Sequence, residues 1–236
     1  MKATPNPYAG YRYPAEIISH AIWLYFRFAL SFRDVEEILA SRGIVVSYEA
    51  VRQWCLRFAQ SYANKIRHQQ GPLGDTWYMD EVFIKINGEL HYLWRAVDQD
   101  GDVVDILVQK HRDKRAAKRF FRKLLKGLRY SPRVIVTDKL RSYGAAKKEI
   151  MPGVVHRQGK WENNRAEISH QPTRQRERQM RRFKSQGHAQ RFLSAHGPIN
   201  NLFRVGRHLL KARHYRLFRD KAFDVWSEVT CAQKAV

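Results

Sequence analysis

Two aspartates occupy positions where a carboxylate needs a partner. Asp80 interrupts the otherwise apolar run Thr76–Ile86, and Asp138 directly follows the apolar run Val134–Thr137. A charge inside a sheet is costly unless it is paired. If the two runs form neighbouring strands, both carboxylates meet at one edge of the sheet. Two carboxylates that lie close together are suitable ligands for Mg²⁺.

An ordinary structural role is the simpler interpretation of each aspartate alone. Asp80 could be a solvated residue where a strand begins, and Asp138 could be a turn or helix-cap residue. In a strongly basic chain the two together favour a metal site. A third acid from a following helix would complete a site for two ions spaced about 3.5–4 Å apart. The candidates for this third ligand are Glu162, Glu167 and Glu177.

Alternating strand patterns and then helical patterns supply the elements that must position these acids. The turn signals Asn87-Gly88 and Asp100-Gly101 separate the first three strands. Strands are expected over residues 76–86, 89–97, 103–109, 133–137 and 154–156, and helices over 114–128 and 143–150. This is the element order of an RNase H-like α/β core, in which the fourth strand lies parallel beside the first. The predicted fold is therefore a mixed five-stranded sheet with flanking helices.

Residues 1–70 show a helical pattern instead. Ser31 with Asp34 forms a capping-box signal, and Ser47 can cap a third helix whose outer face carries Arg52 and Gln53. We expect an all-α helix-turn-helix domain in which Arg52 and Gln53 read base edges in the major groove. A plain three-helix bundle with a solvated outer face is the alternative. A Gly-Pro-Leu-Gly break after residue 70 predicts a DNA-binding domain at 1–70 and a catalytic domain with a basic tail at 71–236.

The charge of the chain indicates its partner. The 236 residues include 44 Lys and Arg but only 22 Asp and Glu, a formal net charge of +22. Such a charge favours nucleic acid, and secondarily an anionic membrane surface. The longest apolar stretch, Ala21–Phe26, is far too short to span a bilayer, and no signal peptide is evident. Two cysteines provide no disulfide framework, so we expect a soluble intracellular protein that binds nucleic acid.

Residues 174–184 hold six bases and one acid. A solvated helix is the usual explanation, but next to a candidate active site the run is better explained as a track for the DNA backbone. The six bases are Arg174, Arg176, Arg178, Arg181, Arg182 and Lys184. If all six met phosphates, the logarithm of affinity would fall with the logarithm of salt concentration at a slope of about −5. Trp161 could stack on an unpaired base, although core packing is favoured.

Three segments carry a resemblance to a known family. The run Asn163–His170 resembles the Asn-Asn-x-x-Glu-x-x-His signature of small bacterial insertion-sequence transposases, the DDE enzymes of the sixth insertion-sequence family. Met79-Asp80-Glu81 with Arg95–Asp98 resembles their first catalytic segment, and Thr137-Asp138-Lys139 their second. The stretch 31–54 is similar to their helix-turn-helix. The resemblance covers the chain from about residue 17 to residue 215.

This resemblance implies a site and a reaction. By position Asp80, Asp138 and Glu167 match the acidic triad, which would hold two Mg²⁺ ions, or Mn²⁺ as a substitute. Arg174 matches a basic position seven residues after the glutamate, and Lys139 joins the DNA-binding group. The implied enzyme binds the terminal inverted repeats, cuts to leave a 3′-hydroxyl and joins this hydroxyl to target DNA.

The implied partners are double-stranded DNA and further copies of the chain, in a homodimer or larger assembly. The expected location is the bacterial cytoplasm, at the nucleoid when DNA is bound. A non-catalytic helix-turn-helix regulator derived from a transposase is the alternative function, and a free-standing nuclease of the same fold is a second.

Two departures from the family pattern stand out. Only 28 residues separate Asp138 from Glu167, fewer than in better-known members, and Pro172 should kink a helix that continues from Glu167 to Arg174. Glu81 alternates to the face opposite Asp80, where we expect it to face solvent or pair with a base. The remaining acids of this region, Asp98, Asp102 and Asp105, read as hairpin-turn residues.

Overall fold

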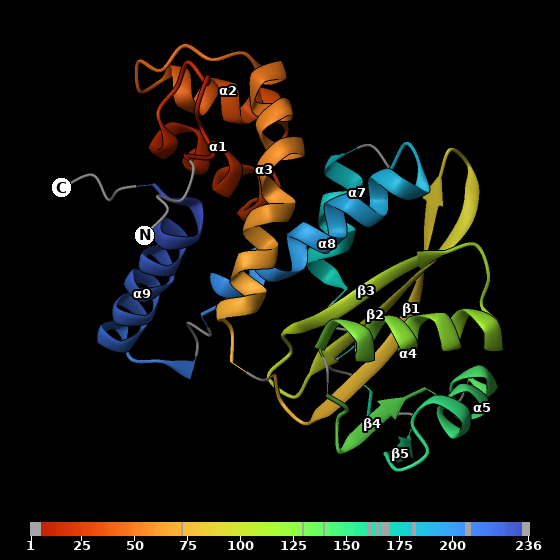
Figure 1. The fold of residues 1–236 in the computed structure, drawn as a ribbon. Helices are drawn as coiled ribbons and strands as arrows, with labels where there is room; N and C mark the ends of the chain where they lie inside the picture. Colours follow the sequence, from red (N-terminus) through yellow and green to blue (C-terminus); the bar gives the residue numbers. More distant parts are fainter. Residues whose placement is uncertain are drawn as a thin grey trace. The chain divides into compact units, whose positions relative to one another are not determined.

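The computed structural model describes residues 6–232 apart from 72, 129, 139, 160–161, 164–165, 167–169, 181–182 and 206–208. The chain divides into two compact units, each described here by itself (Figure 1). One unit comprises residues 71–197, and the other combines residues 1–70 with 198–236. No helix within the described ranges is both long and apolar enough to cross a bilayer.

A five-stranded sheet forms the centre of residues 71–197. Its strands are β1 (Thr76–Ile86), β2 (Glu89–Asp98), β3 (Val103–Gln109), β4 (Val134–Thr137) and β5 (Val155–Gln158), in the spatial order β3-β2-β1-β4-β5. β2 pairs antiparallel with β1 and β3, whereas β4 pairs parallel with β1 and β5. Asn87 and Gly88 both have positive φ, as the tight turn between β1 and β2 requires. This is the predicted RNase H-like topology, which is thereby confirmed.

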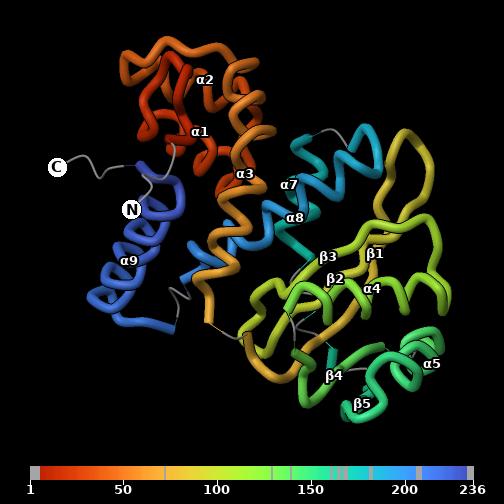
Figure 2. The backbone as a smooth tube through the Cα atoms, in the orientation of Figure 1, coloured from red at the N-terminus to blue at the C-terminus, as the bar shows by residue number. Residues whose placement is uncertain are grey.

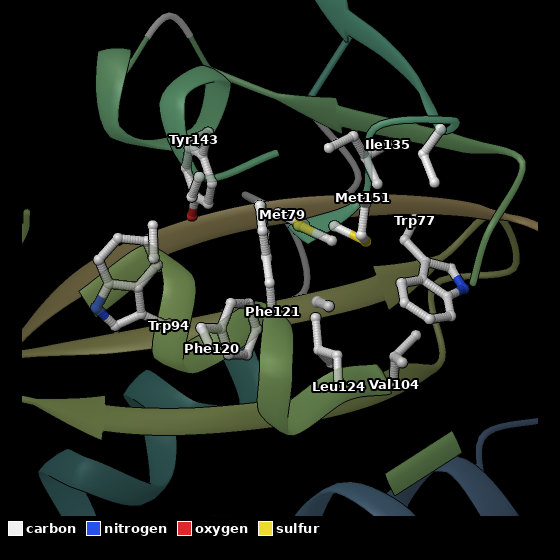
Figure 3. Packing of buried hydrophobic residues seen from close by; sticks show 14 of the residues in the cluster. Trp77, Met79, Trp94, Val104, Phe120, Phe121, Leu124, Ile135, Tyr143 and Met151 are labelled. Atoms are coloured by element: carbon white, nitrogen blue, oxygen red, sulfur yellow. The ribbon is translucent and has the colours of Figure 1, made fainter. Parts of the chain in front are cut away.

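Two helices, α4 (Lys114–Leu128) and α5 (Arg141–Ile150), cover one face of this sheet (Figure 1). Their aromatic side chains, among them Phe120 and Tyr143, pack on Trp77 and Met79 of the sheet in one buried cluster (Figure 3). α4 buries one stripe because its apolar residues recur every three or four positions. The core therefore fixes β1 against the helices that follow β3 and β4.

Two further helices follow, α7 (Gln171–Gln179) and α8 (Gln186–Leu202), and α8 belongs to this unit as far as Gly197. α8 lies along the edge strand β3. There the Gln190 side chain accepts from the Val108 backbone N–H at 2.9 Å, and Gln186 donates to the Val108 carbonyl at 2.9 Å. These amide side chains pair backbone groups that an edge strand would otherwise leave open.

The other unit begins with three helices, α1 (Ala15–Arg27), α2 (Phe32–Ala40) and α3 (Tyr48–Gln69). The predicted capping box at the start of α2 is present: Ser31 Oγ accepts from the Asp34 N–H, and Asp34 Oδ2 from the Ser31 N–H. Ser47 caps α3 by accepting from the Ala50 N–H. The capping residues predicted for α2 and α3 are therefore confirmed.

The C-terminal segment differs from the predicted domain ranges. Residues 198–236 group with the N-terminal helices and not with the sheet, and α9 (Ala212–Thr230) lies beside α3 (Figure 2). The Trp226 ring lies 5.5 Å edge-on from Tyr62 of α3, and Phe203 lies 5.8 Å from Trp23 of α1. Burial of these aromatic rings decides where the segment packs, and its basic charge gives no sign of this placement.

Element boundaries differ by one or two residues at four places. β2 continues to Asp98, and β4 begins at Val134, one residue later than predicted. α5 begins two residues earlier than predicted, and β5 covers 155–158 instead of 154–156. Pro172 lies in the first turn of α7, where a proline needs no backbone partner. The expected kink within a helix is therefore absent from α7.

We expect Trp226→Ala to lower the free energy of unfolding by about 3–5 kcal/mol, because it removes an indole that is 5% exposed. Phe218→Ala on the same helix, where the ring is 46% exposed, should change stability by less than about 0.5 kcal/mol. Urea unfolding measures both values. Hydrogen exchange in Trp226→Ala should accelerate in α1 and α3. Acceleration confined to the sheet would contradict the grouping of α9 with these helices.

Candidate active site

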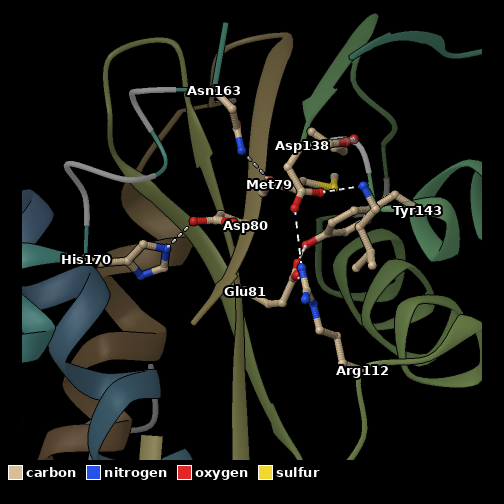
Figure 4. Close-up of polar contacts among 10 residues, drawn as sticks. Met79, Asp80, Glu81, Arg112, Asp138, Tyr143, Asn163 and His170 are labelled. Carbon is tan, nitrogen blue, oxygen red and sulfur yellow. Dashed lines mark hydrogen bonds and ion pairs between the residues drawn. The ribbon is translucent and has the colours of Figure 1, made fainter. Parts of the chain in front are cut away.

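Parallel pairing of β1 with β4 brings Asp80 and Asp138 together. Met79 pairs with Thr137, so the two aspartates are the next residues along their strands. One oxygen from each aspartate and one from Glu81 all lie within 4.8 Å of one another (Figure 4). These three residues form the acidic cluster. The side chain of Asp80 is 16% exposed and that of Asp138 is 37% exposed. The juxtaposition predicted from strand order is therefore present.

Two residues of the signature run contact β1 beside Asp80. Asn163 Nδ2 donates to the Met79 carbonyl at 2.9 Å, and His170 Nε2 lies 3.2 Å from Asp80 Oδ2. Burial lowers the pKa of His170, although the Asp80 contact acts the other way. The imidazole is therefore neutral at pH 7 and leaves the charge of Asp80 uncompensated. Glu167 lies between these two contacts along the sequence but outside the described residues.

Glu81 points into the opposite face of the sheet and is fully buried there. Its Oε2 accepts from the Tyr143 hydroxyl at 2.6 Å, and its Oε1 from Arg112 Nε at 2.5 Å. Burial raises the pKa of Glu81 to about 7, and the two hydrogen bonds oppose this shift. The expected pairing with a base is present, but the expected solvent exposure was wrong. The alternation of buried Trp77 and Met79 already places Glu81 in the buried stripe of β1.

Arg112 was not singled out by sequence reasoning. It lies in the loop between β3 and α4 and reaches Asp138 as well as Glu81, with 3.5 Å between Nη2 and Asp138 Oδ2. Asp138 Oδ1 also accepts from the Leu140 N–H at 2.9 Å. Asp138 is thus a turn residue as well as a member of the acidic cluster. A lone arginine in a loop gives no periodic signal.

The acidic cluster fits a hard divalent cation in its donor chemistry, because carboxylate oxygens are the ligands that Mg²⁺ and Mn²⁺ prefer. Both oxygens of Glu81 are already engaged by Tyr143 and Arg112. Asp80 and Asp138 retain exposed surface. Among the described residues, Asp80 and Asp138 are therefore the pair suited to bind the ion, and Glu81 is not.

An open cavity of about 780 Å³ lies beside Asp80. It is lined by Asp80, Val82, His170, Gln171, Pro172, Arg174, Gln175 and Arg178. Arg174 and Arg178 are one helical turn apart on α7, so both project along the same wall. This wall places positive charge next to the carboxylate of Asp80.

Arg95 attaches α7 to the catalytic strands. It lies opposite Asp80 in the β1–β2 pairing, is 7% exposed, and its Nη1 donates to Thr173 Oγ1 at 2.7 Å. This bond joins the first turn of α7 to the strand beside β1. Arg95 was noted only as part of a family segment, because its position across from Asp80 depends on strand register.

The predicted DNA-binding residues separate into three groups. Arg174, paired with Glu177 at 3.0 Å, lines the cavity with Arg178, while Lys184 is exposed. Arg176 is 2% exposed with its guanidinium over the Phe192 ring. Its predicted place on a solvent-facing track is therefore wrong, because Arg176 shares the inner face of α7 with Thr173. The remaining members, Lys139, Arg181 and Arg182, lie outside the described residues, as does Trp161.

Other predicted site residues have local partners. Arg52 and Gln53 on α3 both donate to the Glu49 carboxylate, at 2.7–2.8 Å. Glu177, a candidate third ligand, also accepts from the Lys85 N–H, and Glu162 is exposed. Neither belongs to the cluster formed by the described acids.

Comparison with known proteins gives a consistent result. A family model described as a DDE domain matches residues 74–206, more than half of the chain. A Staphylococcus aureus transposase for insertion sequence element IS257 in transposon Tn4003 is 32% identical over 160 residues, which is 66% of this chain and 71% of that relative. A transposase for the insertion sequence-like element IS431mec from S. aureus strain Mu50 is 31% identical over the same shares.

One solved structure, the simian T-cell lymphotropic virus intasome in complex with PP2A regulatory subunit B56 gamma, aligns with a TM-score of 0.35 and 17% identity. The alignment covers 43% of this chain and 39% of that chain.

The burial of Glu81 predicts a pH dependence of stability in the presence of chelator. With a pKa of about 7 when folded and an ordinary pKa when unfolded, Glu81 binds more proton in the folded state between about pH 4.5 and 7. Its contribution to the free energy of unfolding therefore falls as pH rises through this window. Glu81→Gln should remove this fall, worth up to about 3 kcal/mol.

Urea unfolding from pH 4.5 to 8.5 measures the effect. Glu149→Gln is the control: hydrogen bonds from Lys114 and Lys118 lower the pKa of that exposed carboxyl to about 2, so its contribution varies only below about pH 4.5 and its stability curve should run parallel to that of the wild type in this range. Parallel stability curves for wild type and Glu81→Gln would show that Glu81 is ionised throughout.

Proposed function

The chain belongs to the DDE transposases of the sixth insertion-sequence family, and on that premise we propose how it acts on DNA. It is a DNA transposase, a metal-dependent polynucleotidyl transferase. Asp80, Asp138 and Glu167 bind the divalent ions, which are Mg²⁺ with Mn²⁺ as a substitute. The observation that carries the proposal is the meeting of Asp80 and Asp138 at adjacent positions of two parallel strands.

The third ligand is assigned by its place in the sequence. Asn163 and His170 both contact β1 next to Asp80, and Glu167 is three residues before His170. This supports Glu167 over Glu177, which pairs with Arg174, and over the exposed Glu162. When bound, the ions activate the attacking oxygen and stabilise the charge on the leaving oxygen.

The chain's own residues orient the reacting groups. The neutral imidazole of His170 lies 3.2 Å from Asp80 Oδ2 and does not cancel the charge of that carboxylate. Arg174 and Arg178 bind phosphates of the strand that enters the cavity beside Asp80. Lys184 extends this contact, and Lys139, Arg181 and Arg182 remain proposed DNA contacts by their positions in the sequence.

The reaction consists of two phosphoryl transfers at the same acids. Water attacks the phosphodiester at the element end, and the bond to the 3′-oxygen breaks, which leaves a 3′-hydroxyl. That hydroxyl then attacks a phosphodiester of target DNA, and the target's own 3′-oxygen departs. No protein side chain forms a covalent bond to DNA. Since two element ends must be joined, the active form is a dimer or larger assembly on DNA.

The helical unit recognises the terminal inverted repeats. α3 presents Arg52 and Gln53 on an exposed face, where Glu49 orders both side chains before DNA arrives. Base edges then replace Glu49 as their partner. This supports a helix-turn-helix, in which α3 is the recognition helix.

We expect Asp80→Asn to reduce cleavage by more than about 100-fold while binding of the element end stays near wild type. Loss of a residue that only hydrogen-bonds to a metal ligand already lowers metal affinity or activity by about 10–100-fold. Asp80 is proposed as the ligand itself, so the loss should be larger. The measurement is nicking of a supercoiled plasmid that carries the element with its native flanks, in Mg²⁺ and in chelator. Asp75→Asn, which alters an exposed acid paired with Arg133, is the control. Cleavage by Asp80→Asn at close to the wild-type rate would show that Asp80 is not a metal ligand.

We expect Arg52→Ala to weaken binding of the terminal repeat by about 1–3 kcal/mol more than binding of a scrambled duplex. Arg57→Ala, which removes another exposed cation from α3, should affect both duplexes alike. Fluorescence anisotropy at one fixed salt concentration measures the four affinities. An equal loss on both duplexes with Arg52→Ala would mean that Arg52 touches only phosphate.

A further inference from the structure

Arg112 occupies a position between two acids with different surroundings. Its Nε donates to Glu81 Oε1 at 2.5 Å, and its Nη2 lies 3.5 Å from Asp138 Oδ2 (Figure 4). The Glu81 side chain has no exposure, whereas that of Arg112 is 36% exposed. The guanidinium is therefore anchored to a buried carboxylate through Nε and reaches the partly exposed Asp138 through Nη2.

The anchor of Arg112 is rigid. Glu81 is also bonded to the Tyr143 hydroxyl at 2.6 Å. Tyr143 is fully buried, 5.3 Å edge-on from Trp94 and 6.1 Å from the stacked ring of Phe121. Because a guanidinium is planar, a bond at Nε fixes the plane in which the two terminal nitrogens lie. Tyr143 and Glu81 thus orient Arg112 toward the site.

Donor groups remain on Arg112 after these contacts. Nη1 has no hydrogen-bond partner among the described residues, and the 3.5 Å contact of Nη2 with Asp138 is long for a charged pair. Because the Arg112 side chain is 36% exposed, these remaining donors are accessible to a ligand that enters the site. Geometry and charge both suit a phosphate oxygen, which accepts from a planar fork of two N–H groups.

We infer that Arg112 is a further substrate-contacting residue, which binds a non-bridging oxygen of the reacting phosphodiester next to Asp138. This inference rests on the proposed function of the site. Negative charge builds up on those oxygens as the attacking oxygen bonds to phosphorus and the leaving oxygen departs. A fixed guanidinium stabilises this charge without reorganisation. Glu81 and Tyr143 act as positioning residues for Arg112.

The test compares Arg112→Ala with wild type on two element-end substrates. One substrate is natural, and the other carries an uncharged methylphosphonate at the reacting phosphate. Arg112→Ala should slow single-turnover cleavage of the natural substrate by about 100-fold, and that of the methylphosphonate by less than about threefold. Arg133→Ala removes a cation from an exposed pair with Asp75 and should leave both rates unchanged.

Two further measurements separate phosphate contact from a purely structural counter-ion. In Ca²⁺, binding of the element end should lose about one unit of its logarithmic salt slope in Arg112→Ala and recover it in Arg112→Lys. If Arg112→Ala proves unstable to heat, Glu81→Gln preserves side-chain size while weakening the anchor. Glu81→Gln should slow the natural substrate by about tenfold and again spare the methylphosphonate.

The outcomes are distinct. Two outcomes would overturn only the role of Arg112 and leave the proposed function intact. In the first, the wild type cleaves normally and Arg112→Ala cleaves at the same rate. In the second, Arg112→Ala slows cleavage of both substrates equally. Failure of the wild type to cleave the natural end would overturn the proposed function and this inference with it.

Discussion

The parallel pairing of β1 with β4 is the constraint on which the site depends. Met79 lies against Thr137, and the next residue on each strand is an aspartate. Because strand side chains alternate, a slip of one residue would send Asp138 to the wrong face relative to Asp80. The register is secured by burial, since Trp77 and Ile135 are paired residues of the same core cluster. The packing of the sheet is therefore a condition for the proposed metal site.

The same strand separates two kinds of acid chemistry. Asp80 faces the cavity and α7, where a neutral histidine is its close neighbour. Glu81, one residue later, faces the helices and is held by Tyr143 and Arg112. Desolvation makes an ionised Glu81 costly without those partners. Adjacent carboxylates thus have different surroundings: Asp80 is the proposed ligand of the ion, and Glu81 holds an arginine beside it.

Local patterns were sufficient for much of the fold. Alternation identified β1 and β3 at their observed ends, the apolar stripe identified α4, and the Ser31–Asp34 pattern identified the start of α2. These elements form from interactions within one strand or one turn. The order of strand and helix patterns then predicted the parallel neighbour of β1.

Features that depend on distant partners were not predictable in this way. Arg176 resembles its exposed neighbours in sequence, yet it packs inward on Phe192 of another helix. Arg112 belongs to a short loop, and its role follows only from where β4 and α5 place Asp138 and Tyr143. The C-terminal helix α9 packs on α3 because Trp226 is buried against Tyr62. The basic charge of the helix does not decide where it lies. Such placements require the tertiary fold.

The most direct test of the proposed metal site is the position of a bound ion. Crystals of the protein with an element-end DNA and Mn²⁺ would locate the metal by its anomalous scattering. We expect manganese coordinated by both Asp80 and Asp138, with Glu81 still bonded to Tyr143 and Arg112. Manganese coordinated by Glu81 in place of Asp80 would contradict the proposed site.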